Sequence, residues 1–195
     1  PATGLSDINN HPPAASTENL GIFGASRKSD VLGQDGVTPI ALTDQITMWT
    51  FGDTILGNWK KEVSVADTFD DAVSIKSMLS NSLAFTVSPT DNNVPDLEFT
   101  FYKENSAVAP FIKNLPEEDP AIWRFWTIDG IRIGDVVYVY YMIITIDHTL
   151  QTYPFAVKGT GIARWAIPEK WQIGDPVRFE RLGMLFDKDQ PTFGD

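Results

Sequence analysis

From Val31 onwards the sequence consists of short runs rich in Val, Ile, Thr, Trp, Phe and Tyr, separated by Gly, Asp and Pro. β-Branched and aromatic residues favour strands, while Gly, Asp and Pro favour the turns between them. This pattern predicts an all-β domain. The strands that we expect cover residues 37–42, 46–52, 83–88, 97–103, 122–128, 130–133, 136–146, 154–158, 161–166 and 178–186.

Two stretches depart from this pattern. Residues 1–30 include Asn-Asn-His-Pro-Pro and have little periodic patterning, so we expect an irregular N-terminal arm before a domain over residues 31–195. Residues 64–81 carry a few apolar side chains at near-helical spacing, which allows a short helix. The aspartates and serines among them also suit a loop. We expect a loop there that carries one helical turn.

Two segments of the chain repeat the same order of features. Asp35-Gly36-Val37 leads to a turn at Asp44-Gln45 and then to an aromatic run. Asp129-Gly130-Ile131 leads to a turn at Gly134-Asp135 and then to the Tyr-rich run that starts at Val136. Each copy predicts a strand, a tight turn and a partner strand, which is the inner part of a propeller blade.

Acidic residues at equivalent positions of such blades would converge on one mouth of the channel, so Asp35, Asp53 and Asp129 are expected to share a site. Neighbouring carboxylates raise one another's pKa and can keep one of them protonated near neutral pH. Glycosidic bond cleavage requires such a pair, one as acid and the other as base or nucleophile. A separation of about 5 to 5.5 Å predicts retention, and about 6.5 to 9.5 Å predicts inversion. A turn role alone is also open, because Asp-Gly is a common turn pair.

Aromatic residues accompany these aspartates. Trp126 precedes Asp129 by three residues, and Trp49 precedes Asp53 by four. The faces of such rings pack well against the C–H faces of sugars, and they are also common core fillers of sheets. Trp126 and Trp49 are therefore candidate substrate-binding residues. The same aromatics would serve a carbohydrate-binding module without catalysis.

Charge and composition narrow the class of partner. The net charge of −11 argues against nucleic acid, because such binding depends on Lys and Arg that displace condensed counterions. A polysaccharide or oligosaccharide fits better. The longest apolar run, residues 136–146, is shorter than the roughly 18 residues that a membrane span needs, so none is expected. The absence of cysteine excludes disulfides and thiolate metal sites.

The remaining candidates for chemistry are weaker. His11 and His148 form no spaced ligand set and favour no Ser-His-Asp triad, and Asp147-His148 is typical of a surface turn. Gly159-Thr160-Gly161 lacks the third glycine of a dinucleotide motif, which favours a Gly-rich strand. We expect no cofactor and no metal. Calcium would need several oxygen ligands, and no contiguous loop supplies them.

The segments Gly33-Gln34-Asp35-Gly36, Thr47 to Thr54 and Trp126 to Ile131 resemble a family of five-bladed β-propellers, formerly of unknown function, that includes bacterial endo-D-arabinanases. The family is distantly similar to the arabinanase and xylosidase propellers. Its pattern is an early Asp-Gly segment followed, eighteen residues on, by Trp-x-Phe-Gly-Asp-Thr, and Asp35 and Asp53 match these positions. The resemblance implies that these two are catalytic and that Asp129 positions substrate or tunes a pKa.

The resemblance also sets expectations for the whole protein. About two of the five blades are present, so we expect either that the remainder of the propeller is missing or that copies assemble into a closed ring as a homo-oligomer. The implied function is a glycoside hydrolase acting on arabinofuranose-type or related polysaccharide. The alternatives are a non-catalytic carbohydrate-binding propeller module and a structural or interaction protein. Such substrates lie outside the cytoplasm, which favours a secreted or cell-envelope location.

Overall fold

The computed structural model describes residues 29–60, 72–88 and 97–190. The predicted arm over residues 1–30 lies almost entirely outside these residues, and so does His11. The described part contains thirteen strands in four antiparallel sheets, so the all-β class is confirmed. None of its helices has the length and apolar character that crossing a membrane would require.

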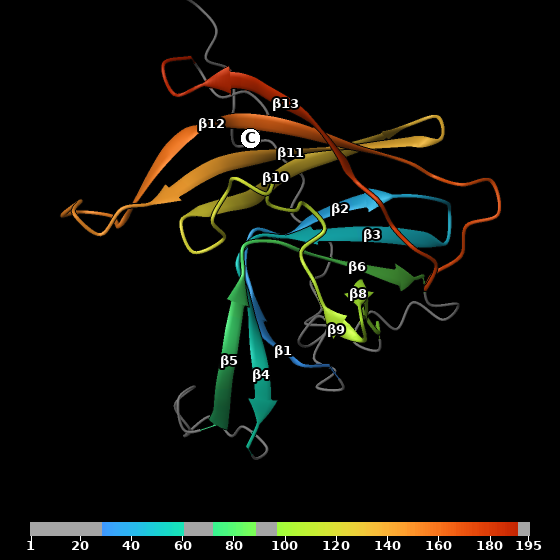
Figure 1. The fold of residues 1–195 in the computed structure, drawn as a ribbon. Coiled ribbons are helices and arrows are strands. Elements are labelled where there is room, and N and C mark those ends of the chain that lie inside the picture. Colours follow the sequence, from blue (N-terminus) through green and yellow to red (C-terminus); the bar gives the residue numbers. More distant parts are fainter. Residues whose placement is uncertain (1–28, 61–71, 89–96, 191–195) are drawn as a thin grey trace, which may run out of the picture.

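The largest sheet is a four-stranded meander that crosses the top of Figure 1. Its strands follow chain order: β10 (Trp123–Ile133), β11 (Val136–Ile146), β12 (Phe155–Ala166) and β13 (Glu180–Asp187). In β11, Val137, Val139 and Tyr141 are buried, while the residues between them are partly exposed on the other face. Alternation with a period of two is the signature of a strand with one core face. Gly134, with φ of 61°, makes the tight turn from β10 to β11.

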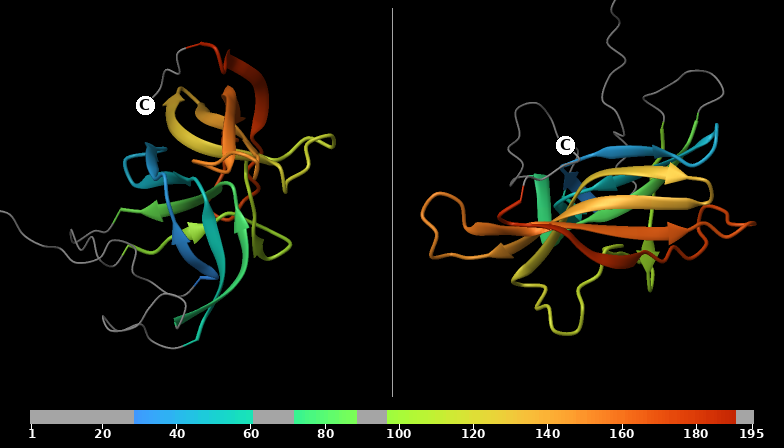
Figure 2. Two further views of the ribbon diagram at one scale, coloured as in Figure 1. Left: turned by 90° about the vertical axis from the view of Figure 1, so that its left-hand side faces the viewer. Right: turned by 90° about the horizontal axis from the view of Figure 1, so that it is seen from above.

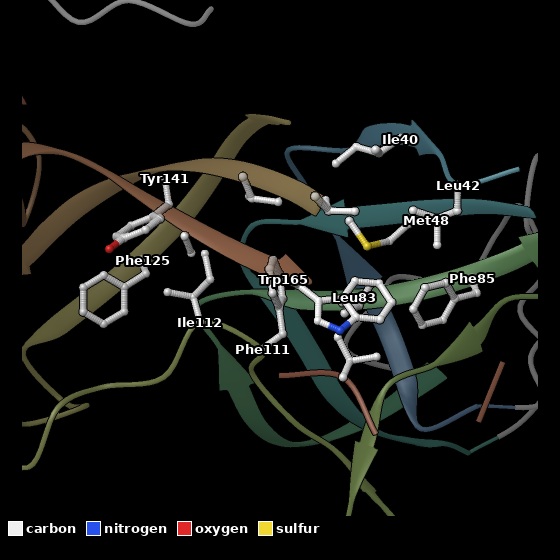
Figure 3. Packing of buried hydrophobic residues seen from close by; sticks show 14 of the residues in the cluster. Ile40, Leu42, Met48, Leu83, Phe85, Phe111, Ile112, Phe125, Tyr141 and Trp165 are labelled. Atoms are coloured by element: carbon white, nitrogen blue, oxygen red, sulfur yellow. The ribbon is translucent and has the colours of Figure 1, made fainter. Parts of the chain in front are cut away.

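A second four-stranded sheet lies below the first in Figure 1. Its order is β2 (Thr38–Ala41), β3 (Ile46–Phe51), β6 (Ser82–Val87) and β7 (Thr100–Phe101). One hydrophobic cluster draws on both sheets and forms the main core, shown in Figure 3. Its members include Ile40, Met48, Leu83, Phe85, Phe111, Ile112, Phe125, Val139, Tyr141 and Trp165.

A three-stranded arm extends away from these two sheets (Figures 1 and 2). It has the order β1 (Val31–Gln34), β4 (Thr54–Trp59) and β5 (Val73–Leu79). Its own buried cluster is small and consists of Leu32, Ala72 and Val73. A separate short hairpin pairs β8 (Lys103–Glu104) with β9 (Ala107–Val108).

Three chain segments connect the arm and the second sheet. The passage from β1 to β2 uses residues 35–37, that from β3 to β4 uses 52–53, and that from β5 to β6 uses 80–81. Phe51 pairs with Ser82 and Thr54 pairs with Leu79, so the ladder resumes directly on each side of the bend. We call residues 35–37, 52–53 and 80–81 the corner.

The strand predictions hold best where side chains alternate. The predicted strand 136–146 coincides with β11, whereas 122–128 and 130–133 belong to the single strand β10. The predictions 154–158 and 161–166 likewise merge into β12, so Gly159-Thr160-Gly161 is a Gly-rich strand as expected. The strand predicted over 97–103 is mostly wrong, since only the two-residue β7 and the first residue of β8 fall within it.

The loop with a helical turn predicted over residues 64–81 is wrong for residues 73–79, which form β5; residues 61–71 lie outside the described residues. Only Val73 of this strand is fully buried, and the next five residues are exposed. The strand exists because it pairs with β4 along the arm, not because its own pattern demands it. β1 and β4 were not predicted either.

The predicted repeat is correct for its hairpins and wrong for its Asp-Gly pairs. β2 and β3 form one hairpin, and β10 and β11 form the other. Asp35-Gly36 lies in the corner before β2, where Gly36 has φ of 57°. Asp129-Gly130 instead lies inside β10, beside a register shift between Thr127 and Asp129. The two pairs therefore occupy different places in the two hairpins.

Candidate functional site

The corner places Asp35 and Asp53 side by side. The N–H of Asp35 donates to the carbonyl of Asp53 at 3.2 Å, and the N–H of Gly52 donates to the carbonyl of Asp35 at 2.9 Å. Gly52 is buried, and a Cβ atom added to it would lie 2.6 Å from Oδ1 of Asp35. Glycine at this position thus makes room for the Asp35 carboxyl group against the main chain.

The environment of Asp35 raises its carboxyl pKa above the ordinary value. Burial of the carboxyl group is the largest cause, and the negative charge of Asp53 adds to it. Hydrogen bonds from main-chain N–H groups at Asp53 and Asp35 act in the opposite direction and are weaker. The burial is partial, since much of the Asp35 residue is exposed; Oδ1 of its carboxyl group lies beside Gly52. A carboxyl that keeps its proton to higher pH is suited to donating it.

Asp53 has a contrasting environment built by β10. The Arg124 guanidinium lies 2.7 Å from Oδ1 of Asp53 in an ion pair whose side chains are 13% and 22% exposed. The indole N–H of Trp126 donates to the same oxygen at 3.0 Å. Arg124 and Trp126 are two residues apart on one strand and therefore lie on the same face. Both of these bonds are made to Oδ1, and none of the described residues bonds to Oδ2 of Asp53.

Replacing Asp35 by asparagine should raise the melting temperature at neutral pH. The raised pKa means that the folded state favours the protonated acid, and this stabilisation is lost as pH rises through the folded pKa. Asparagine does not ionise and escapes that loss. The gain should be largest near pH 7 and disappear below about pH 4, where the unfolded carboxyl is also protonated. Thermal unfolding at a series of pH values tests this, with Asp44→Asn in the β2–β3 turn as control. Equal melting temperatures of parent and Asp35→Asn near pH 7 would contradict it.

Side-chain hydrogen bonds hold β10 against the corner. β10 is an edge strand of its sheet, and its outward carbonyls need partners. The amide of the fully buried Asn81 donates to the carbonyl of Phe125 at 3.2 Å, and the hydroxyl of Thr38 donates to the carbonyl of Ile128 at 2.8 Å. Phe125 lies between Arg124 and Trp126, so Asn81 fixes the stretch that reaches Asp53.

The buried face of β10 is anchored by Phe125. The Arg181 guanidinium lies 4.3 Å above the Phe125 ring and pairs with Glu118 through Nη1 at 2.5 Å and Nη2 at 3.0 Å. Its Nε donates to the Tyr141 hydroxyl at 3.1 Å. Burial raises the pKa of Glu118, but the hydrogen bonds from Arg181 and the Leu115 N–H outweigh it, and the net pKa is lowered. This cluster keeps Phe125, and with it the residues on either side, in a fixed position.

The other residues predicted for the site lie in different surroundings. Asp129 is exposed on β10, and its carboxylate accepts a hydrogen bond from the N–H of Gly130 at 2.7 Å. Trp49 belongs to a separate aromatic group: its ring meets Phe99 edge-on at 5.8 Å, and its indole N–H donates to Thr86. Neither shares a hydrogen bond or ring contact with the aspartate pair among the contacts of the described residues, so their substrate-binding roles stay predictions.

The remaining candidates are the residues of the expected surface turn at Asp147-His148 and the side chains that could bind a metal ion. His148 lies in the turn between β11 and β12, where Oδ1 of Asp147 accepts bonds from the N–H and hydroxyl of Thr149. Within residues 29–60, 72–88 and 97–190, no group of three or more His, Asp or Glu side chains is arranged to hold a metal ion.

A large cleft has walls that reach Gln34, the residue before Asp35, without including the aspartate pair. Its volume is about 1530 Å³, and its walls include Phe99, Phe101, Tyr102, Lys113 and Phe179 but neither aspartate. Cleft size alone would favour it as the binding site. We favour the corner instead, because two adjacent carboxyl groups in contrasting environments, one with a raised pKa, have a defined chemical use there.

Sequence reasoning missed Arg124, which forms the closest ionic contact of the pair. The only signal for it is its position two residues before Trp126, which places both on one face of a predicted strand. That signal becomes specific only once β10 is known to lie beside the corner. The ion pair joins residues that are 71 positions apart in the chain.

Comparisons with known proteins give a likeness in fold. No protein-family model matches the chain, and no curated protein matches it in sequence. Among solved structures, it is similar to the crystal structure of a putative hydrolase from Bacteroides ovatus ATCC 8483, with a TM-score of 0.53 and 16% identity. The likeness covers 80% of this chain and 40% of that one. The chain thus spans less than half the length of this structural neighbour, and the likeness supports the all-β fold.

Proposed function

We propose that this chain carries the paired carboxyl groups of a glycoside hydrolase. In this proposal Asp35 donates a proton to the leaving glycosidic oxygen, and Asp53 acts on the opposite side as base or nucleophile. The observation that carries the proposal is the corner itself, which sets two carboxyl groups on neighbouring connecting segments in contrasting environments. Glycoside hydrolysis uses such a pair.

The contacts of each aspartate support this division of roles. Asp35 has a raised pKa, as a general acid requires. Asp53 forms a charge-assisted hydrogen bond with the permanently charged guanidinium of Arg124. Both of its donors meet Oδ1 and leave Oδ2 for the reaction. Arg124 acts here as a positioning residue, since it orients Asp53 and has no contact with the glycan in this scheme.

The proposed substrate is a neutral polysaccharide of arabinofuranose type or a related kind. The resemblance of the Asp35 and Asp53 segments to endo-D-arabinanases favours this class. A net charge of −11 disfavours anionic glycans. The description of the structural neighbour as a hydrolase agrees with a hydrolytic reaction but does not specify the bond that is cut. Such a substrate would place the protein outside the cytoplasm, in the envelope or secreted.

The two four-stranded sheets are compatible with two adjacent blades of a β-propeller. Each has four antiparallel strands, the number in a blade, and β2 and β10 are their first strands. β2 and β10 are in contact, as the innermost strands of adjacent blades would be. A closed propeller needs further blades, from further copies of the chain or from another part of the protein. Ile131 and Ile133, 52% and 61% exposed on β10, offer apolar surface for such a neighbour.

The purified chain should release oligosaccharides from arabinan, and release less from xylan and arabinogalactan. Product analysis by chromatography measures this, with Asp44→Asn as a control that carries a substitution of the same kind in a turn outside the corner. Folding is verified by circular dichroism in the same preparations. A folded protein that releases no product from any of these glycans would overturn the proposal.

A non-catalytic carbohydrate-binding module is the second candidate. It is favoured by the ion pair of Arg124 with Asp53, because a carboxylate that is already paired can serve as a fixed hydrogen-bond acceptor for sugar hydroxyls. Binding of arabinan without any release of product would identify this function.

A further inference from the structure

Three aromatic rings, each in contact with the next, extend from Asp53 toward the turn between β11 and β12. Trp126 donates its indole N–H to Asp53. The Trp126 ring meets Phe155 edge to face, with centroids 5.0 Å apart, and Phe155 meets Tyr153 at 5.6 Å. Phe155 begins β12, and Tyr153 lies in the turn that joins it to β11, at the left of Figure 1. We call Trp126, Phe155 and Tyr153 the aromatic row.

The outer end of the aromatic row is exposed on a well-defined turn. Tyr153 is 64% exposed, and Leu150 beside it in the same turn is 42% exposed. The turn is closed by a hydrogen bond from the N–H of Asp147 to the carbonyl of Pro154 at 2.9 Å. A second bond runs from the N–H of Leu150 to the carbonyl of Asp147 at 3.2 Å. The Tyr153 ring is therefore displayed to solvent from an ordered support.

Aromatic rings in a row have a recognised use in binding. An aromatic side chain offers a rigid apolar face at low entropic cost, and the tyrosine hydroxyl remains available for hydrogen bonds. Sugars present both apolar C–H faces and hydroxyl groups that form hydrogen bonds. Trp126 and Phe155 are partly exposed and Tyr153 is exposed, whereas Phe125 and Trp165 are buried in the main core.

We propose that the aromatic row is an extended binding site for consecutive residues of a neutral glycan, with Trp126 nearest the bond that is cut and Tyr153 farthest from it. This inference rests on the proposed function for the direction of the chain toward Asp35 and Asp53. The net charge of −11 disfavours an anionic glycan. A site of this length would hold the interior of a polysaccharide and favour cleavage within the chain.

The test measures binding of linear arabino-oligosaccharides, from disaccharide to octasaccharide, by calorimetry in the full chain carrying Asp35→Asn to prevent turnover. Adding Tyr153→Ala should weaken octasaccharide binding by about three- to tenfold, the value of one aromatic contact. The ratio of octasaccharide to disaccharide affinity should fall accordingly. Tyr153→Phe should retain most of the affinity because it keeps the ring. Ile133→Ala, an equally exposed apolar site at the far end of β10, is the matched control.

The outcomes separate this inference from the proposed function. If Tyr153→Ala leaves the length dependence unchanged, or if no oligosaccharide binds at all, the aromatic row is not a glycan site. If binding shows the expected length dependence while the parent chain hydrolyses nothing, the row stands and the hydrolase proposal fails. Phe155→Ala, verified as folded by its melting temperature, should weaken the binding of oligosaccharides shorter than those that Tyr153→Ala affects. If the two variants change the length dependence of binding identically, the proposed order of the rings is wrong.

Discussion

Replacing Asp35 or Asp53 by asparagine is expected to lower the rate of arabinan hydrolysis by about a hundred- to ten-thousand-fold, the usual contribution of one positioned acid or base. The two variants should differ on an aryl arabinoside whose leaving group needs little protonation. Asp35→Asn should retain much of its activity on this substrate, because only the acid is lost. Asp53→Asn should lose activity on both substrates, because the attack itself is lost.

The measurement is the rate on both substrates, with Asp44→Asn as control and the melting temperature of each variant recorded. The parent rate should also fall on the alkaline side as pH rises through the raised pKa of Asp35, since the acid must be protonated. Asp35→Asn should lack this alkaline decline on the aryl substrate. Full activity of either variant on arabinan would exclude that residue from catalysis, and the reverse pattern on the aryl substrate would exchange their roles.

Replacing Asn81 by alanine is expected to lower the free energy of unfolding by about 3 kcal/mol or more, because buried polar groups left without partners cost about 1 to 3 kcal/mol each. Asn81 is fully buried and uses both ends of its amide. Its Oδ1 accepts from the N–H groups of Phe111 and Ile112, each at 3.0 Å. Its Nδ2 donates to the carbonyls of Ile112 at 3.1 Å and Phe125 at 3.2 Å. Alanine leaves all of these groups unpaired.

Urea unfolding of the purified chain measures this loss. Asn58→Ala is the matched control, since Asn58 is exposed on β4 and bonds only to Lys76, which is also exposed; it should cost less than about 1 kcal/mol. The Asn81 variant should also lose hydrolytic activity below its unfolding midpoint, because the Phe125 carbonyl that it holds lies between the two partners of Asp53. A similar small cost for both variants would show that Asn81 does not join the loop at Phe111 to β10.

The parts of the fold that could be predicted are those that the sequence encodes locally. β11 alternates buried and partly exposed residues from Val136 to Ile143, and Gly134 marks the turn before it. β5 could not be predicted, because most of it is exposed on the arm and its apolar residues do not alternate. Its strand conformation comes from pairing with β4, which is a tertiary property.

The candidate site also has one part that the sequence encodes locally and another that depends on the tertiary fold. The positions of Asp35 and Asp53 are given by a short motif, and their adjacency follows from the pairing of the strands around the corner. The partners of Asp53 come from β10, whose approach to the corner depends on Asn81 and Thr38. No local pattern encodes an approach between segments so far apart in sequence. The similarity of Asp129-Gly130 to Asp35-Gly36 was misleading, because the backbone gives the two pairs different conformations.

The first residue of β4 pairs with the last residue of β5. This arrangement has an evolutionary consequence. Thr54 and Leu79 are cross-strand neighbours, so the chain from one to the other is an excursion with adjacent ends. Such an excursion can be lengthened, shortened or exchanged without changing the pairing of β3 with β6. The length and sequence of the arm could therefore change among descendants of this protein while the two larger sheets and the main core keep their packing.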